Sequence, residues 1–438
     1  MKSSISKAEN ELAQELLKFI HESPSVFHAI ASTKQILVAY GFQELQWEDA
    51  WTLKQNGKYF ITKNGSALLA FVVGHEPPAR YGFHIIGTHT DSPGFRVKPN
   101  PEIPVDGQYV KLNVETYGGP ILNTWLDRPL SLAGRVILRG TSVYHPETVL
   151  YSSDQPLLVI PNLAIHLNSK INEGVELNRQ KDLLPLLSMF TNSLERTFLT
   201  DHLAQALRIE SEQIIDFDLY LHEFEKGCTF GLNQEFISAP RLDDLAMVHA
   251  SVKAITQAEV GRATSVLACF DHEECGSTSK QGAASPLLSH VLERIMLSLN
   301  ASREEYFQAL AQSFLISADM AHALHPNSSE KHDPVIKPVL NRGPIIKISA
   351  NQSYATDAET STVFESLCHQ VDVPVQKFVN RSDERGGSTI GSISTTQLEI
   401  RSVDVGNPIL AMHSIRETAG VKDHLAMTKV LTEFFQSS

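Results

Sequence analysis

The chain has 438 residues, of which 42% are hydrophobic and 20% are charged, and its formal net charge is -13 at pH 7. This length is ample for a large hydrophobic core, whereas the acidic charge balance argues against nucleic acid or an anionic membrane surface as a partner. No apolar run approaches the length of a membrane span, and residues 1–11 lack the apolar core of a signal peptide. With four cysteines and no CxxC spacing, we expect a cytoplasmic protein.

Helical and strand-like segments alternate over both ends of the chain. A capping box at residues 6–9 precedes apolar residues at helical spacing, and a second helix is predicted over residues 25–41. Strands are predicted at residues 59–62, 67–73, 83–87, 266–270, 314–317, 344–349 and 375–379, with further helices at 355–371 and 421–435. This alternation predicts an α/β architecture with helices on both faces of a sheet.

The middle third of the chain has a different pattern. Residues 109–116, 130–138, 148–152 and 157–167 are rich in β-forming residues. In the first of these runs, Val110, Leu112 and Val114 alternate with polar residues, as in a half-buried strand. We therefore expect an inserted β-rich domain over residues 98–234, which divides the α/β domain into residues 1–97 and 235–438.

Five apolar runs are each followed by side chains that can bind a metal. In chain order these side chains are His89 with Asp91, Asp243, Glu273 with Glu274, Asp319, and His413. Taken alone, His89 also fits a core histidine and Asp243 a helix N-cap. Ligands at one edge of a sheet converge although they are distant in sequence, and neighbouring carboxylates stay ionised only if a cation or strong donors compensate them. Two imidazoles and three carboxylates suit two divalent ions, with zinc the first choice and manganese or cobalt as substitutes.

Several long motifs also occur in one order along the chain. They include Gly87-Thr88-His89-Thr90-Asp91-Ser92-Pro93-Gly94, Tyr117-Gly118-Gly119, Pro240-Arg241-Leu242-Asp243, Asp271-His272-Glu273-Glu274-Cys275-Gly276-Ser277, and Ala411-Met412-His413-Ser414-Ile415-Arg416-Glu417. With these motifs the chain resembles the aspartyl aminopeptidase family of dinuclear zinc exopeptidases from end to end. The resemblance implies an α/β/α zinc-exopeptidase domain of mixed sheet, an inserted dimerisation domain, and hydrolysis of the amino-terminal residue of peptides.

The resemblance also implies a role for each site residue. Two ligand sets would share the bridging residue Asp243, namely His89 with Asp319 for one zinc ion and Glu274 with His413 for the other. Asp91 would orient His89. Glu273 would take a proton from the attacking water and deliver it to the departing amine. Relatives often carry a cis peptide bond after the bridging aspartate, so we expect one between Asp243 and Asp244.

Partners and substrates follow from the same resemblance. Relatives form dimers that assemble into tetrahedral dodecamers, and His166 of the inserted domain would reach the partner subunit's active site to stabilise the oxyanion. Lys347, Tyr354 and His322 would bind the side chain of an amino-terminal Asp or Glu. From local sequence alone, His166 fits an ordinary strand residue and Lys347 a solvent-facing one. Ser353 stands where many relatives carry a basic residue.

Three other functions remain open at this point. The first is a broader aminopeptidase that favours neutral residues on the same scaffold. The second is a non-catalytic cargo or assembly protein, although a full set of candidate ligands argues against it. The third is a metal-dependent deacylase of amino-acid derivatives, which the inserted domain disfavours. In every case we expect no nucleic acid and no membrane as partner.

Overall fold

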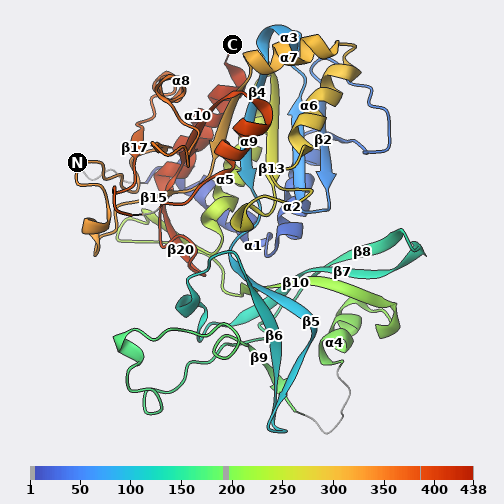
Figure 1. Cartoon of the computed structure of the whole chain (residues 1–438), viewed down its shortest axis with the longest axis vertical. Coiled ribbons are helices and arrows are strands. Elements are labelled where there is room, and N and C mark those ends of the chain that lie inside the picture. The colour runs from blue at the N-terminus through green and yellow to red at the C-terminus, as the bar shows by residue number, and fades with distance from the viewer. Residues whose placement is uncertain (1–4, 191–196, 385, 438) are drawn as a thin grey trace.

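A nine-stranded mixed sheet is the centre of the computed structural model, which describes residues 5–190, 197–384 and 386–437 (Figure 1). Four adjacent parallel strands form its middle: β13 (Thr264–Phe270), β4 (Phe83–His89), β14 (Phe314–Ala318) and β18 (Arg401–Gly406). The flanking strands are β1 (Gln43–Glu44), β2 (Lys58–Lys63) and β3 (Ala67–Val72) beside β13, and β16 (Ile345–Lys347) and β17 (Gln376–Phe378) beside β18. The parallel strands therefore end together at one edge of the sheet.

Helices cover both faces of this sheet because its central strands are apolar on both sides. In β13, Leu267 and Cys269 point into one core while Val266 and Phe270 point into the other. The first core is closed by α1 (Lys7–His21), α2 (Val26–Ala39), α5 (Leu242–Gln257), α8 (Ala358–Gln370) and α10 (Val421–Gln436). The second is closed by α3 (Pro78–Tyr81), α6 (Leu287–Ser298), α7 (Arg303–Gln312) and α9 (Ile390–Leu398). The predicted α/β/α architecture is confirmed.

A second sheet of six antiparallel strands lies below the first in the view of Figure 1. Its strands, in spatial order, are β8 (His145–Ser152), β7 (Leu130–Ser142), β10 (Ile214–Glu223), β5 (Gly94–Val105), β6 (Tyr109–Tyr117) and β9 (Leu186–Met189). The sheet has its own core, to which α4 (Phe198–Leu207) contributes Leu199 and Leu203. We call residues 94–223 the insert, since the chain leaves the central sheet before them and returns after them. The predicted limits of 98 and 234 for a dimerisation domain stay a proposal.

One predicted run of strand is wrong. Within residues 157–167, Leu158 and Val159 form only isolated bridges, and the chain from 160 to 185 consists of loops and the short 3-10 helix η2 (Ile171–Glu173). Leu163, Ile165 and Leu167 are exposed in this loop, so no neighbouring layer buries this part of the predicted strand. Alternating hydrophobicity predicts a strand only where such a layer exists.

A third sheet of five strands connects the two larger ones. It consists of β11 (Cys228–Phe230), β12 (Phe236–Ala239), β20 (Glu417–Gly420), β19 (Pro408–Leu410) and β15 (Ala321–His322). At this junction Glu223, whose side chain is 0% exposed, accepts from Arg128 of the insert at 2.8 Å and from Arg416 at 2.7 Å. A buried carboxylate needs such partners, so this triad fixes the end of the insert against the α/β domain. Across the described ranges, none of the helices has the length and apolar character needed to cross a membrane.

Candidate metal centre

The predicted ligands converge where the parallel strands end. His89 is the last residue of β4, Glu273 and Glu274 lie in the 3-10 helix η4 (Glu273–Cys275) just after β13, and Asp319 follows β14. The other two come from elsewhere: Asp243 lies in the first turn of α5, and His413 lies between β19 and β20. Carboxyl ends of parallel strands are where α/β proteins place ligand sites. Here the sheet edge brings together residues separated by more than three hundred positions in sequence.

Asp243 lies between two groups of candidate ligands. Its Oδ1 atom is 3.4 Å from Nε2 of His89, which is also 3.8 Å from Oδ1 of Asp319. Its Oδ2 atom is 3.8 Å from Nε2 of His413, which is 3.4 Å from Oε2 of Glu274. Two ligand atoms on one tetrahedral zinc ion, each about 2.1 Å from the metal, lie about 3.4 Å apart. The distances within each group are therefore those of atoms that share an ion.

The charges at the site also require a cation. Asp243, Asp319 and the neighbouring Asp244 are all buried, and one carboxylate oxygen of Asp243 and one of Asp244 have no hydrogen-bond partner. Burial and the carboxylate of Asp243 raise the pKa of Glu274 well above its ordinary value. Buried like charges stay ionised together only when an opposite charge compensates them. The donor set thus fits a divalent metal, and imidazole with carboxylate is a combination that zinc accepts.

Glu273 is suited to moving a proton beside the ligands. Burial raises the pKa of Glu273 to about 8, and the carboxylates of Asp319 and Asp91 add to the rise. Its carboxylate lies within 4.8 Å of ligand atoms of His89 and Glu274. A group with a pKa near neutrality can both accept and return a proton, as general acid–base catalysis needs.

Two further carboxylates hold the ligands and were not predicted from the sequence. Glu417, which is 2% exposed, accepts from the backbone N–H of His413 at 2.8 Å and from that of Asp243 at 3.0 Å. Asp244 accepts from the backbone N–H of His89 at 3.1 Å, and the Asp243–Asp244 peptide bond is cis, as expected. No sequence pattern predicted this role of Glu417, because its hydrogen-bond partners are backbone N–H groups that only the tertiary fold brings to it.

Asp91 lies against the ring of His89, and its main chain is closer than its carboxylate. The carbonyl oxygen of Asp91 lies 3.1 Å from Nδ1 of His89, while its carboxylate oxygen Oδ1 is 3.5 Å from the same atom. When Nδ1–H donates to that carbonyl, the Nε2 lone pair faces Asp243 and Asp319. A ligating histidine is commonly fixed in this way by the bond from its other ring nitrogen.

A cavity of about 430 Å³ opens beside the candidate ligands. Its lining includes Lys347, Tyr354 and His322, together with Glu273 and Asp319. Lys347 is 3% exposed, and its Nζ lies 3.2 Å from Oδ2 of Asp319 and 5.6 Å from the ring centre of Tyr354. Although burial opposes the charge, the carboxylate of Asp319 raises the pKa of Lys347, so its ammonium group stays charged. The solvent-facing alternative for Lys347 is wrong.

His166 lies apart from this cavity within its own chain. It is exposed on a turn of the loop between β8 and β9, and it is not among the residues that line the cavity in the described ranges. Its predicted action on a partner subunit therefore remains a prediction.

Comparisons with known proteins show which family and which solved structures the chain is similar to. Residues 19–435 match the family model of the aminopeptidase I zinc metalloproteases (M18). A probable M18 family aminopeptidase 2 of Clostridium novyi (strain NT) is 55% identical over 426 residues, covering 97% of this chain and 98% of the relative. A chain in a cryo-EM structure of the Ape4 and Nbr1 complex superimposes with a TM-score of 0.93 at 36% identity, covering 98% of this chain and 86% of that chain. The S. cerevesiae mApe1 dodecamer gives 0.85 at 28% identity, covering 98% and 97%.

We expect zinc uptake by the metal-free protein to release protons. Near pH 7 Glu273, with a pKa of about 8, is largely protonated before the metal binds, and a metal favours its ionised form. The raised pKa of Glu274 acts in the same direction. The apparent zinc affinity should therefore fall as the pH is lowered from about 8 to about 6, because protons compete with the metal. Calorimetric titrations in buffers of different ionisation enthalpy measure the released protons directly. A binding heat that is the same in every buffer would contradict this prediction.

Proposed function

The chain belongs to the aminopeptidase I zinc metalloprotease (M18) family, and we propose that it uses two zinc ions to remove Asp or Glu from the amino terminus of peptides. The observation that carries the substrate choice is the buried, charged Lys347 in the cavity beside the ligands. The proposed ligands are His89, Asp243 and Asp319 for one ion and Asp243, Glu274 and His413 for the other. Manganese or cobalt would fit the same nitrogen and oxygen donors.

In the proposed reaction, each residue of the site has a separate role. The zinc ions, when bound, supply Lewis-acid polarisation of the scissile carbonyl and activation of the attacking water. Glu273 takes the proton that the water loses and returns it to the nitrogen of the departing amine. Asp91 keeps His89 in one orientation, so the ligand does not rotate as charge develops. Glu417 holds the backbone of Asp243 and of His413 in the same manner.

Lys347 is the proposed selector for an acidic side chain. Its ammonium group pairs with Asp319, whose carboxylate would also bind a metal ion. An ammonium group has three N–H donors, so those that do not face Asp319 can bind a substrate carboxylate that enters the cavity. The neighbouring Tyr354 is 4% exposed and offers a hydroxyl, and His322 stands at the exposed rim. A neutral side chain in this cavity would leave a buried ammonium without a second partner. This argues against the broader aminopeptidase that favours neutral residues.

We further propose a homo-oligomer in which sites are completed between subunits. A relative of 28% identity is a dodecamer, and the loop that carries His166 exposes Leu163, Ile165 and Leu167 in a single chain. Contiguous exposed apolar residues are typical of surfaces that pair. His166 of the partner subunit would donate a hydrogen bond to the developing oxyanion. A cytoplasmic location is supported by the four cysteines, all of which are free.

Glu273→Gln should retain both metals and lose most turnover. The amide keeps the shape of the side chain but cannot carry the proton, which costs a factor of about 10² to 10⁴ in kcat. Metal content by elemental analysis and kcat on an Asp-linked reporter are the two measurements. The matched variant is Glu274→Gln, which should lose metal as well. Loss of metal from Glu273→Gln would refute its assignment as a proton carrier.

Lys347→Met should reduce kcat/KM for Asp-linked reporters by about 10- to 100-fold while changing Leu-linked reporters little, because a hydrogen bond to a charged group contributes about 1.5–3 kcal/mol. The control is Lys377→Met on the adjacent strand β17, where the lysine is half exposed and pairs with Glu365. Metal content is measured in both variants, since Lys347 touches Asp319. Equal losses on Asp and Leu reporters would place the acidic selector elsewhere.

His166→Phe should lower turnover without changing the oligomer, as measured by size-exclusion chromatography with light scattering. Mixing this variant with Glu273→Gln and allowing subunits to exchange tests whether the histidine acts across the interface. In a mixed dimer, the site with an intact Glu273 receives His166 from its partner, so statistical exchange restores roughly a quarter of wild-type activity. If His166 acts only within its own chain, no site is complete and no activity returns.

A further inference from the structure

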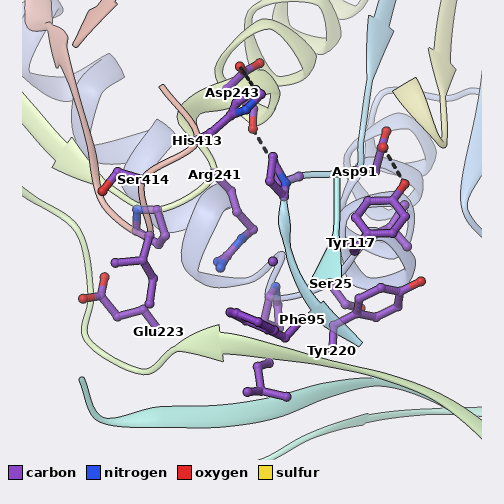
Figure 2. Close-up of a pocket in the computed structure, with 18 of the residues that line it drawn as sticks. Ser25, Asp91, Phe95, Tyr117, Tyr220, Glu223, Arg241, Asp243, His413 and Ser414 are labelled. Carbon is purple, nitrogen blue, oxygen red and sulfur yellow. Dashed lines mark hydrogen bonds and ion pairs between the residues drawn. The ribbon is translucent and has the colours of Figure 1, made fainter. Parts of the chain in front are cut away.

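The motif Tyr117-Gly118-Gly119 belongs to the insert but lies against the metal centre. Tyr117 is the last residue of β6, and its hydroxyl donates to Oδ2 of Asp91 at 2.6 Å. Figure 2 shows this bond in a cavity that is lined by residues of both parts of the chain, among them Tyr117, Tyr220 and Phe95 of the insert and Asp91 and Asp243 of the α/β domain. The segment therefore reaches residues that the proposed function places beside the metals.

Asp91 also contacts three other residues of the site. Besides Tyr117, its carboxylate accepts from the backbone N–H of Glu273 at 3.2 Å and from that of Glu274 at 3.1 Å. Its carbonyl oxygen lies 3.1 Å from Nδ1 of His89. Since Asp91 is 4% exposed, water does not replace a missing donor at this carboxylate. The hydroxyl of Tyr117 thus helps to fix one proposed ligand on each side of Asp243.

The same segment also contacts the second histidine. The carbonyl oxygen of Gly119 lies 3.1 Å from Nδ1 of His413, and the backbone N–H of Ile121 donates to the carbonyl of His413 at 2.9 Å. A bond from Nδ1–H to this carbonyl leaves the Nε2 lone pair facing Glu274 and Asp243. The main chain of the insert therefore selects the tautomer that a metal ligand needs.

Glycine is required for so close an approach. Gly118 has a φ of +63°, and a Cβ atom added there would lie 3.1 Å from Cβ of Glu274 and 3.3 Å from its carbonyl oxygen. Any larger residue at this position would be strained and would press on Glu274. The segment is shaped to fit between the turn that carries Glu274 and the loop that carries His413.

We propose that residues 117–119 of the insert are a positioning element of the metal centre, which holds His89 through Asp91 and holds His413 through the carbonyl of Gly119. The insert thereby sets the metal affinity of the α/β domain in addition to any role in pairing subunits. This inference rests on the proposed ligand set, because it assigns a function to the groups that orient those ligands. Tyr117 acts through Asp91 and is a positioning residue.

The test is zinc affinity of Tyr117→Phe, measured by competition with a chromophoric chelator. Loss of an outer partner of a metal ligand typically weakens binding about 10- to 100-fold, and we expect a loss in that range. The control is Tyr220→Phe, whose ring lies 6.0 Å away in a T-shaped contact with Tyr117 and whose hydroxyl is not among the donors to Asp91. It should keep wild-type affinity. The visible spectrum of the cobalt-substituted protein should change in Tyr117→Phe alone, since the spectrum reports ligand geometry.

Thermal unfolding of each metal-free variant separates positioning from a loss of fold. Equal zinc affinity and cobalt spectra for Tyr117→Phe and wild type would overturn the proposal. If Tyr117→Phe does not fold, Gly118→Ala decides, because it keeps the hydroxyl yet crowds Glu274; unchanged zinc affinity in that variant would equally overturn it. A wild-type protein that binds no zinc would instead refute the ligand set, and with it the proposed function.

Discussion

The structure depends on one constraint, namely that several carboxylates lie together, away from water, at the edge where the parallel strands end. Asp243, Asp244 and Asp319 are buried within reach of the imidazole of His89, Asp243 is also within reach of that of His413, and one oxygen of Asp243 has no hydrogen-bond partner. Such a cluster is unstable unless cations share it. Neighbouring groups compensate part of this negative charge. Lys347 places a positive charge beside Asp319, and the carboxylate of Glu417 accepts hydrogen bonds from two backbone N–H groups.

The insertion point is part of the same arrangement. His89 ends strand β4 of the first sheet, Asp91 follows it, and the chain enters the insert at Gly94, five residues after this proposed ligand. It returns through Glu223, which pairs with Arg416, three residues beyond His413. The insert therefore contacts the segment that carries His89 and the segment that carries His413, so a shift of the insert would move both histidines. This explains how a sheet that contributes no proposed ligand within its own chain can still influence the chemistry.

The sequence predicted the architecture well because its signals were local and redundant. Apolar runs such as the one that ends at Phe270 gave the buried strands, and the capping box at Ser6 and Glu9 began α1. The convergence of His89, Glu274 and Asp319 could be predicted because parallel strands end at one edge, whereas His413 comes from a loop between two strands of the third sheet. Glu417 and Gly119 could not be predicted, since they act through main-chain groups whose meeting depends on the tertiary fold. The strand prediction failed at residues 163–167 because the alternating apolar residues Leu163, Ile165 and Leu167 are exposed there, with no layer to bury them.

The measurement that tests the account most directly is kcat/KM of the zinc-loaded protein on four reporters that differ only in the amino-terminal residue: Asp, Glu, Leu and Lys. The buried ammonium of Lys347 beside the metal centre predicts that Asp and Glu exceed Leu by at least about tenfold, the effect of one charge-assisted contact, and that Lys is the poorest substrate. Chelation should abolish every rate. A protein with its metals bound that hydrolyses the Leu reporter as well as the Asp reporter would contradict the proposed specificity, and one with no activity on any reporter would contradict the proposed function.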